Sequence, residues 1–318
     1  MITRCAPPDM HQIVNLNSSV PYHLKPGEPV PAEITRIVRE EIDAAAGQLS
    51  GQGEANRDEA IHEARKNVKK IRGVLRLVQP ELGEVYRAEN VRFRDIGRKL
   101  SHYRDAGAML EAFDALLEAH RDELGRRKFP SIRRGLMRRK QEAEQEGNLD
   151  VVLRQIAATL RRSAQRDGEW PLKQDGFQAI EPGLLATFRR GRKTLKLANR
   201  HPSAENFHEW RKRVKEHWYH VRLLEEFWSG STEAYEKKLK ELETALGEDH
   251  NLVLLQEKIE AEPAFYGRPP EVALFMKLME KYHKKMRAQA LHLGKSLYDD
   301  KPSRFTRHLR RLWESKES

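Results

Sequence analysis

The chain of 318 residues contains a single cysteine, Cys5, few aromatic residues and no long apolar run. One thiol excludes an internal disulfide framework and a cysteine-based zinc site. No stretch approaches the ~18 consecutive apolar residues of a membrane span, and the N-terminus lacks the charged-then-apolar pattern of a secretory signal. Aromatic residues at 7% argue against a β-sandwich, whose strands need more of them. We therefore expect a helical protein of a reducing compartment, the cytoplasm, with no membrane partner.

Positive charge is what the sequence has in excess. Lysine and arginine number 59 against 48 aspartates and glutamates, which gives a formal net charge of +11. Charged residues make up 34% of the chain, above the usual ~25%, and hydrophobic residues 38%, below the usual ~45–50%. This balance indicates a modest core, a large charged surface and an anionic partner.

Proline and hydrophobic periodicity divide the chain. Residues 1–31 contain six prolines and no helical period, and they are predicted to form an extended or partly disordered arm. From Ala32 onward the apolar residues recur with the period of amphipathic helices, and no alternating strand pattern is found. The fold class is therefore predicted to be all-α, built from helical bundles. The predicted helices cover residues 32–47, 57–79, 84–124, 127–146, 204–228, 232–262 and 270–298, a helical block over 150–200 with loop signals that include Pro182–Gly183, and a last helix after Pro302.

An internal repeat organises these helices. Residues 62–69 return as 208–215, which is 146 residues later, and at the same offset 100–105 falls on 246–251 without a gap. Such self-similarity is typical of tandem structural units. We expect a first helical-bundle unit over residues 32–170 and a second over residues 171–318, after the arm of residues 1–31.

Each copy of the repeated helix carries a stripe of cations on one face. At about 100° per residue, the basic side chains of the first copy fall within an arc of roughly 120°, opposite the apolar side chains. A solvated helix face usually interleaves glutamate with lysine, because like charges repel. The stripe spans about 21 Å and is predicted to bind an extended polyanion. Its members are His62, Arg65, Lys66, Lys69, Arg72 and Arg76, and in the second copy His208, Arg211, Lys212, Lys215 and Arg222.

Further basic residues recur near helical spacing outside the stripe. Any one of them is more often part of a solvated surface than of a binding site, so they are secondary candidates. They are Arg94, Arg98, Lys99, Arg134, Arg138, Lys284 and Arg307.

Motifs that are typical of catalysis or of metal binding are incomplete or absent in the sequence. His-Glu pairs at residues 62–63 and 208–209 begin like a zinc-protease helix, but no histidine follows four positions later. His217 and His220 have a metal-ligand spacing, yet His217 projects onto an apolar face, which favours a buried, hydrogen-bonded histidine. No phosphate-cradling Gly-rich loop and no Gly-x-Ser-x-Gly elbow occurs. We expect a protein that is not an enzyme and that holds no metal and no cofactor.

A His-x-x-Arg-Lys/Arg-x-x-Lys/Arg helix followed by a Leu-Gly-x-x-Arg-Asp-type segment, present twice, resembles the conserved histidine α-helical domain (CHAD) family. The resemblance covers about residues 30–315 and its elements appear in order in both halves. The matching residues are His62, Arg65, Lys66, Lys69, Arg72, Arg76, Leu100, Arg104 and Asp105, and then His208, Arg211, Lys212, Lys215, Arg222, Leu246, Gly247, His250 and Asn251.

The resemblance implies two helical bundles related by pseudo-twofold symmetry, whose basic helices line a central groove or pore. In the family this site binds inorganic polyphosphate, and the domain is a binding and targeting module, in some members on polyphosphate granules. By this resemblance Arg104 joins the stripe residues as a binding residue. The Glu-x-Glu-x-Lys strand of the triphosphate-tunnel domain found in some members is not seen, which implies the stand-alone form.

The second unit departs from the family pattern, and its substitutions predict weaker phosphate binding than in the first unit. We therefore expect an asymmetric site dominated by the helices of the first unit. In the second unit Glu216 replaces Lys70, Trp218 replaces Arg72, and His250-Asn251 replaces Arg104-Asp105.

Two other functions stay open beside polyphosphate binding. A nucleic-acid-binding helical protein fits the charge of +11, although the basic helices lack base-reading Asn and Gln residues and a helix-turn-helix signature. A metal-dependent hydrolase of polyphosphate or of a nucleoside triphosphate would depend on a group such as Asp105 or His62. The sequence predicts no oligomeric state.

Overall fold

The computed structural model describes residues 22–50, 57–124, 129–145, 149–166, 170–227 and 231–317. Throughout these ranges the elements are helices and no strand occurs, which confirms the all-α fold class. None of the helices described is long and apolar enough to cross a membrane.

Helices follow one another with short connections. The first half contains α1 (Val30–Gln48), α2 (Arg57–Leu77), α3 (Gln79–Leu82), α4 (Glu84–Ala119), α5 (Arg121–Leu124), α6 (Pro130–Gln145) and α7 (Leu149–Arg166). The second half contains α8 (Gly176–Arg200), α9 (Ala204–Leu223), the 3-10 helix η2 (Glu225–Phe227), α10 (Ser231–Ala261), α11 (Pro263–Tyr266), α12 (Pro269–Leu297) and α13 (Pro302–Glu317).

The sequence prediction of an interruption at Pro182–Gly183 is wrong, because Pro182 lies inside α8. A proline within a helix removes one backbone hydrogen bond and costs about 3 kcal/mol. The helix continues because Gly183 and Leu184 are buried, and a Cβ added at Gly183 would overlap the carbonyl oxygen of Leu77. Close packing of α8 on the end of α2 therefore outweighs the effect of the proline.

The segment before α1 differs from the predicted arm where it is described. Tyr22 and Leu24 are buried, the Tyr22 hydroxyl donates to the Lys70 carbonyl oxygen at 3.1 Å, and Leu24 N donates to Leu223 O at 2.8 Å. Residues 22–24 thus pack against the helices, because two apolar side chains and two hydrogen bonds hold them there. The rest of the predicted arm lies outside the described residues.

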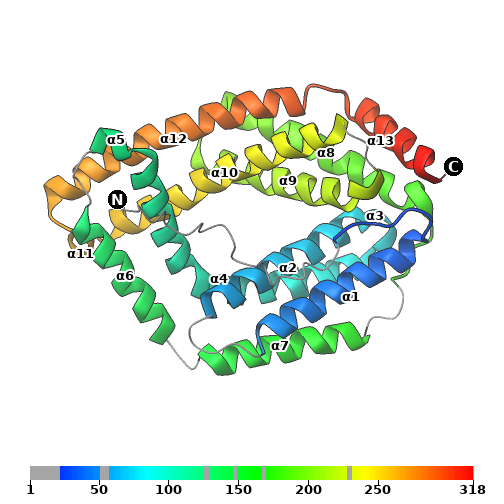
Figure 1. Cartoon of the computed structure of the whole chain (residues 1–318), viewed down its shortest axis with the longest axis horizontal. Coiled ribbons are helices and arrows are strands. Elements are labelled where there is room, and N and C mark those ends of the chain that lie inside the picture. Colours follow the sequence, from blue (N-terminus) through cyan, green and yellow to red (C-terminus); the bar gives the residue numbers. More distant parts are fainter. Residues whose placement is uncertain are drawn as a thin grey trace, which may run out of the picture.

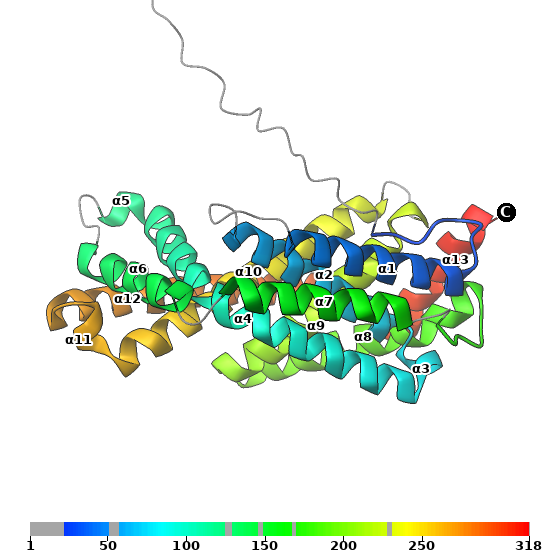
Figure 2. The same cartoon turned by 90° about the horizontal axis from the view of Figure 1, so that it is seen from below.

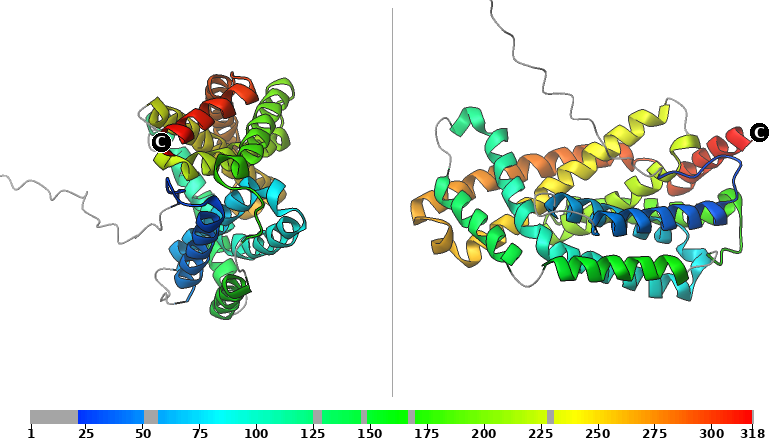
Figure 3. Two further views of the ribbon diagram at one scale, coloured as in Figure 1. Left: turned by 90° about the vertical axis from the view of Figure 1, so that its right-hand side faces the viewer. Right: turned by 60° about the horizontal axis from the view of Figure 1, so that its bottom comes forward.

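The two halves of the sequence form two layers that meet along α2 and α9. Figure 1 shows α1, α2 and α7 in the lower layer and α8, α9 and α12 in the upper one. The end-on view in Figure 3 separates the blue and cyan helices of the first half from the orange and red helices of the second. α2 packs on α1, α4 and α9, and α9 packs on α8, α10 and α2. The two basic helices thus hold corresponding places, each among its own half and against the other.

Two hydrophobic cores lie toward opposite ends of the long helices α4 and α10. The larger core takes residues from both layers, among them Phe93, Phe188 and Trp210. The smaller core lies among α4, α6, α10 and α12, around Phe113 and Phe275. Figure 2 shows this second region as a lobe that contains α5, α6 and α11. Since both cores draw on both halves of the chain, the division into separate units stays a prediction.

Candidate anion-binding cleft

α2 and α9 cross at the centre of the molecule, where Gly73 meets Tyr219. A Cβ added at Gly73 would lie 3.1 Å from Tyr219 Cβ and 3.1 Å from the Tyr22 hydroxyl. His220 Nε2 donates to the Gly73 carbonyl oxygen at 3.0 Å. Gly73 and Tyr219 are 146 residues apart, so the helices touch at corresponding positions of the repeat. The missing side chain of Gly73 lets the two backbones approach and brings their basic faces together.

Local sequence fixes the two helices on either side of this crossing. α9 begins after Ser203, whose hydroxyl accepts a hydrogen bond from Asn206 N at 3.2 Å, as an N-cap residue does. One face of each helix is apolar and buried, and it includes Val74 of α2 and Trp210 of α9. The remaining face of each helix presents the cations at helical spacing.

A cleft of about 310 Å³ lies beside the crossing. Seven of its lining side chains are lysine or arginine, and one, Glu216, is acidic. Because like charges repel in a partly desolvated site, this lining favours the binding of an anion. The lining residues are Lys69, Arg72, Gly73, Arg76, Arg211, Lys212, Arg213, Lys215, Glu216 and Tyr219.

Lys69, Arg72 and Arg211 are the cations of the cleft that form no ion pair within the described part of the chain, although Arg72 Nε donates to Asn90 Oδ1 at 3.1 Å. Burial lowers the pKa of Lys69 well below its ordinary value, and the positive charges of Lys215 and Arg65 lower it further. Burial also lowers the pKa of Arg211, whose Nε is buried and finds no hydrogen-bond partner in the described ranges. Buried polar groups are normally satisfied, so this pair indicates a place that an external anion completes.

Lys215, the counterpart of Lys69 in the repeat, is neutralised. Its Nζ lies 2.8 Å from Glu243 Oε1, and Lys240 approaches the same carboxylate at 2.8 Å. Burial acts to raise the pKa of Glu243, but Lys215 and Lys240 outweigh burial and lower this pKa to about 2. The residue 146 positions before Glu243 is Gly97, so the α2 side has no carboxylate at the corresponding place. The unneutralised charge of the cleft therefore centres on Lys69 and its neighbour Arg211.

The predicted stripe continues beyond the cleft toward the histidines. Arg65 donates to the Ser101 hydroxyl at 2.9 Å and lies 3.7 Å from Asp105. Arg104 Nε donates to His62 Nδ1 at 3.4 Å, and its guanidinium also pairs with Glu111 at 2.6 Å.

The second copy holds the corresponding contact, since His208 Nδ1 lies 3.1 Å from His250 Nδ1, and both contacts span 42 residues of sequence. Burial lowers the pKa of both His62 and His208, with Arg104 and Lys212 adding to the effect. At neutral pH these histidines are therefore neutral hydrogen-bonding groups.

Two arginines that the sequence analysis does not single out contribute to the other end of the cleft. Arg213 Nη1 lies 2.9 Å from Glu216 Oε1, and Arg190 Nη2 lies 3.9 Å from Glu216 Oε2. Arg76 contacts the same carboxylate. Arg190 comes from α8, so only the packing of α8 on α9 reveals it.

The structure brings only some of the predicted binding residues together. Lys66 is exposed and pairs with Glu63 at 2.7 Å, away from the cleft. Arg222 lies 5.3 Å from the Trp218 ring and 5.6 Å from the Tyr22 ring and does not line the cleft. Those that line the cleft are Lys69, Arg72, Arg76, Arg211, Lys212 and Lys215.

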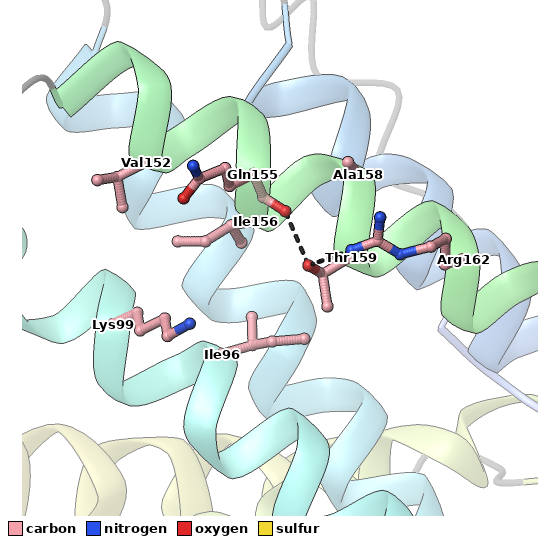
Figure 4. A pocket seen from close by; sticks show the side chains of 8 residues that line it. All are labelled: Ile96, Lys99, Val152, Gln155, Ile156, Ala158, Thr159 and Arg162. Carbon is pink, nitrogen blue, oxygen red and sulfur yellow. Dashed lines mark hydrogen bonds between the residues drawn. The ribbon is translucent and has the colours of Figure 1, made fainter.

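None of the secondary candidates lines this cleft. Lys99 belongs to another cleft, of about 330 Å³, between α4 and α7, where Figure 4 shows it across from Ile156 and Arg162. Arg94 and Arg98 contact Asp95 at 2.9 and 4.0 Å. The other four lie on other helices. Arg134 and Arg138 line a hollow between α6 and α11. Lys284 pairs with Glu280 at 2.8 Å, and Arg307 is exposed on α13.

The expectation that His217 is a buried, hydrogen-bonded histidine is confirmed. His217 Nδ1 lies 3.0 Å from the Tyr298 hydroxyl, and burial lowers the pKa of His217 and of His220 to about 3. Among the described residues no group of three His, Cys, Asp or Glu side chains is placed to hold a metal ion.

A known family of protein domains matches the part of the chain that contains the cleft. The sequence model of the CHAD domain matches residues 36–260, which include both basic helices. The chain belongs to the CHAD domain family. No curated protein matches it.

Two solved structures resemble this CHAD domain protein. One is described as PptA from Streptomyces chartreusis, with 15% sequence identity and a TM-score of 0.54 over 90% of this chain and 100% of that chain. The other is the crystal structure of the CHAD domain from the plant Ricinus communis, with 17% identity and a TM-score of 0.47 over 85% of this chain and 90% of that chain. At such identities the likeness to the first structure concerns the fold alone.

Proposed function

We propose that this CHAD domain protein binds inorganic polyphosphate in the cleft between α2 and α9, without hydrolysing it. The CHAD domain family is associated with polyphosphate. The observation that carries the proposal is the set of seven cations around one carboxylate in the cleft. Lys69 and Arg211 at its centre lack an anionic partner among the described residues, and an oxyanion would supply one.

The mechanism is multivalent attraction combined with charge-assisted hydrogen bonds. Arginine offers forked donors to phosphate oxygens, and lysine adds a mobile point charge. A chain of phosphates reaches several cations at once and releases the counterions that it carried, as nucleic acids do on protein binding. We expect affinity to rise with chain length and to fall steeply with salt.

The arrangement of the helices supports polyphosphate over duplex DNA. A helix that reads DNA enters the major groove with an open basic face. Here the basic faces of α2 and α9 turn toward each other across a narrow cleft, and Gly73 is in contact with Tyr219. This arrangement favours a slender anion over a duplex as the ligand.

The lining also supports binding without hydrolysis. Nearly all its polar side chains are donors, and the one carboxylate, on Glu216, already contacts three arginines. We place this binding activity in the cytoplasm, on polyphosphate granules or on free chains.

The test is a titration with polyphosphate of defined length, at several salt concentrations, with release of orthophosphate followed in parallel. Wild type is compared with the double variant Lys69→Glu/Arg211→Glu. Charge-assisted hydrogen bonds contribute about 1.5–3 kcal/mol each, so we expect affinity to fall by about tenfold or more. The introduced carboxylates lie beside Arg65 and Lys215, which pair with them, so the fold is expected to persist.

A matched control carries the same change of charge on the surface. Lys284→Glu/Arg307→Glu alters two exposed cations outside the cleft, and we expect polyphosphate affinity to change less than about twofold. Equal losses in the two double variants would show that only the net charge matters. Duplex DNA that competes as well as polyphosphate, at equal phosphate concentration, would favour the nucleic-acid function. Metal-dependent release of orthophosphate would favour a hydrolase.

A further inference from the structure

One end of the cleft gathers three arginines from three helices around a single carboxylate. The Glu216 side chain is 11% exposed, and Arg213 Nη1 lies 2.9 and 3.1 Å from its two oxygens. Arg190 Nη2 lies 3.9 Å from Oε2, and Arg76 contacts Oε1. The guanidinium groups thus come from α2, α8 and α9 and converge on one point.

One carboxylate does not neutralise three guanidinium groups. Arg213 has a second acid, Glu209, at 3.7 Å, but Glu209 also pairs with Lys212. Burial lowers the pKa of Arg190 and of Arg213, and the charge of Arg76 lowers both further. Arg190 Nε is buried and has no hydrogen-bond partner in the part of the chain that the structure describes. The cluster therefore keeps unused donors and excess positive charge.

We propose that Arg76, Arg190 and Arg213 form a phosphate subsite at the end of the cleft, and that Glu216 occupies it as an internal competing anion in the free protein. The inference rests on the proposed function and adds a residue that limits affinity. A phosphate group carries more charge and more acceptor oxygens than a carboxylate, and the arginine fork matches it. A bound phosphate takes the place of Glu216 and accepts hydrogen bonds from Arg76, Arg190 and Arg213.

The position of the cluster suits the end of a bound chain. Arg76 follows Lys69 by seven residues on α2, which is about 10 Å along the helix. A short polyphosphate bound at Lys69 and Arg211 therefore reaches the cluster with its other end. Tripolyphosphate is the probe we choose, because it has few phosphates and its affinity depends strongly on each subsite.

The first arm of the test removes a donor. Arg190→Gln takes one guanidinium from the subsite, and Arg189→Gln makes the same change of charge at the neighbouring, exposed position of α8. We expect Arg190→Gln to weaken tripolyphosphate binding by about fivefold or more, and Arg189→Gln to change it by less than about twofold. Equal effects in the two variants would overturn the subsite.

The second arm removes the competing anion. Glu216→Gln keeps the shape of the side chain and removes its charge, and we expect it to strengthen tripolyphosphate binding by about threefold or more. Glu241→Gln, at an exposed position of α10, makes the same change of charge and should have little effect. Opposite effects of Arg190→Gln and Glu216→Gln are what an anion subsite requires. A general loss of structure would weaken binding in both variants.

The outcomes separate this inference from the proposed function. Wild type that binds neither tripolyphosphate nor long polyphosphate would overturn both. Wild type that binds, together with a Glu216→Gln variant that is folded and binds no more tightly, would overturn the competing role of Glu216 alone. If Glu216→Gln does not fold, the comparison of Arg190→Gln with Arg189→Gln decides whether the subsite exists.

Discussion

At the scale of single residues, the charge of the cleft depends on a carboxylate that α10 has and that α4 lacks at the corresponding position. Glu243 neutralises Lys215, and Gly97 stands at the corresponding position of the first half, where an added Cβ would meet Val68, the residue before Lys69. A desolvated lysine without a counter-ion is unfavourable until an anion arrives. The binding strength that we attribute to Lys69 therefore has its origin in the glycine at position 97.

Placing an acid at position 97 tests this origin. A Cβ added at Gly97 meets only Val68 Cγ1, at 3.5 Å, so a side chain is tolerated there. We expect Gly97→Glu to pair with Lys69 and to weaken polyphosphate binding by about fivefold or more in an affinity titration. Gly97→Gln has nearly the same shape without the charge and serves as control. Equal affinities of the two variants would contradict the role given to Lys69.

The lowered pKa of Lys69 predicts proton uptake when polyphosphate binds. Burial and neighbouring cations favour the neutral amine in the free protein, and a bound phosphate favours the ammonium form. Calorimetric titrations at several pH values below the ordinary pKa of lysine, in buffers of different ionisation enthalpy, should therefore report protons taken up by the complex. Lys69→Arg keeps the charge but does not titrate, so we expect it to bind with less proton uptake. Unchanged uptake in this variant would assign the proton to another group.

At the scale of whole helices, close contacts at glycines set the positions of α2, α8 and α9. A Cβ at Gly183 would overlap the Leu77 carbonyl oxygen, which is backbone and has no room to move away. We expect Gly183→Ala to lower the free energy of unfolding by about 3 kcal/mol or more, as overpacking does. Chemical denaturation followed by helical circular dichroism measures this change.

The matched control for this substitution is Gly47 in α1. A Cβ added there meets nothing within 4 Å. Since alanine favours helix over glycine by about 1 kcal/mol, Gly47→Ala should leave stability unchanged or raise it slightly. A Gly183→Ala variant as stable as Gly47→Ala would contradict the described packing of α8 on α2.

Hydrophobic periodicity predicted the helices well, because burial and backbone preference agree along most of them. α9 follows the pattern found over residues 204–228, and Ser203 supplies a start signal at its N-terminus. Pro182 misled the prediction, since its local preference was outweighed by the contact of Gly183 with α2. Sequence rules weigh local conformation and do not see a tertiary contact of this kind.

The candidate site was predicted only in part, for a similar reason. The helical stripe identified Lys69 and Arg211, because cations at helical spacing share a face. Arg190 escaped, because it lies on another helix and joins the cleft only through packing. Gly97 escaped as well, since a missing carboxylate has meaning only after the contact of Lys215 with Glu243 is known.

At the scale of the whole molecule, one buried histidine joins the two layers and another lies inside the upper layer. His220 of α9 donates to the Gly73 carbonyl oxygen of α2, and His217 lies 3.0 Å from the Tyr298 hydroxyl beyond the end of α12. Both histidines are buried, and burial lowers their pKa to about 3, with the positive charges of Arg76 and Arg190 adding to the effect at His220. The contact between the layers therefore requires a neutral His220, and the packing inside the upper layer requires a neutral His217.

This requirement predicts a loss of stability in mild acid. An unfolded histidine takes up a proton near pH 6.5, whereas in the folded state these two do so near pH 3. Because the unfolded state binds more protons between these values, the free energy of unfolding falls as the pH falls from about 6.5 toward 3. Each histidine contributes about 1.4 kcal/mol per pH unit in that range, so the two together contribute about 3 kcal/mol between pH 6 and pH 5.

Denaturant titrations from pH 8 to pH 5 measure this loss, in a range above that in which carboxylates with ordinary or lowered pKa values titrate. His217→Phe places an apolar ring among Phe188, Phe305 and Tyr298, and we expect it to reduce the pH dependence by about 1.4 kcal/mol per pH unit. His308→Gln removes an exposed histidine of α13, which is in contact with water in both states, and should leave the dependence unchanged. A wild-type stability that stays constant between pH 7 and pH 5 would mean that His217 and His220 are not buried as described.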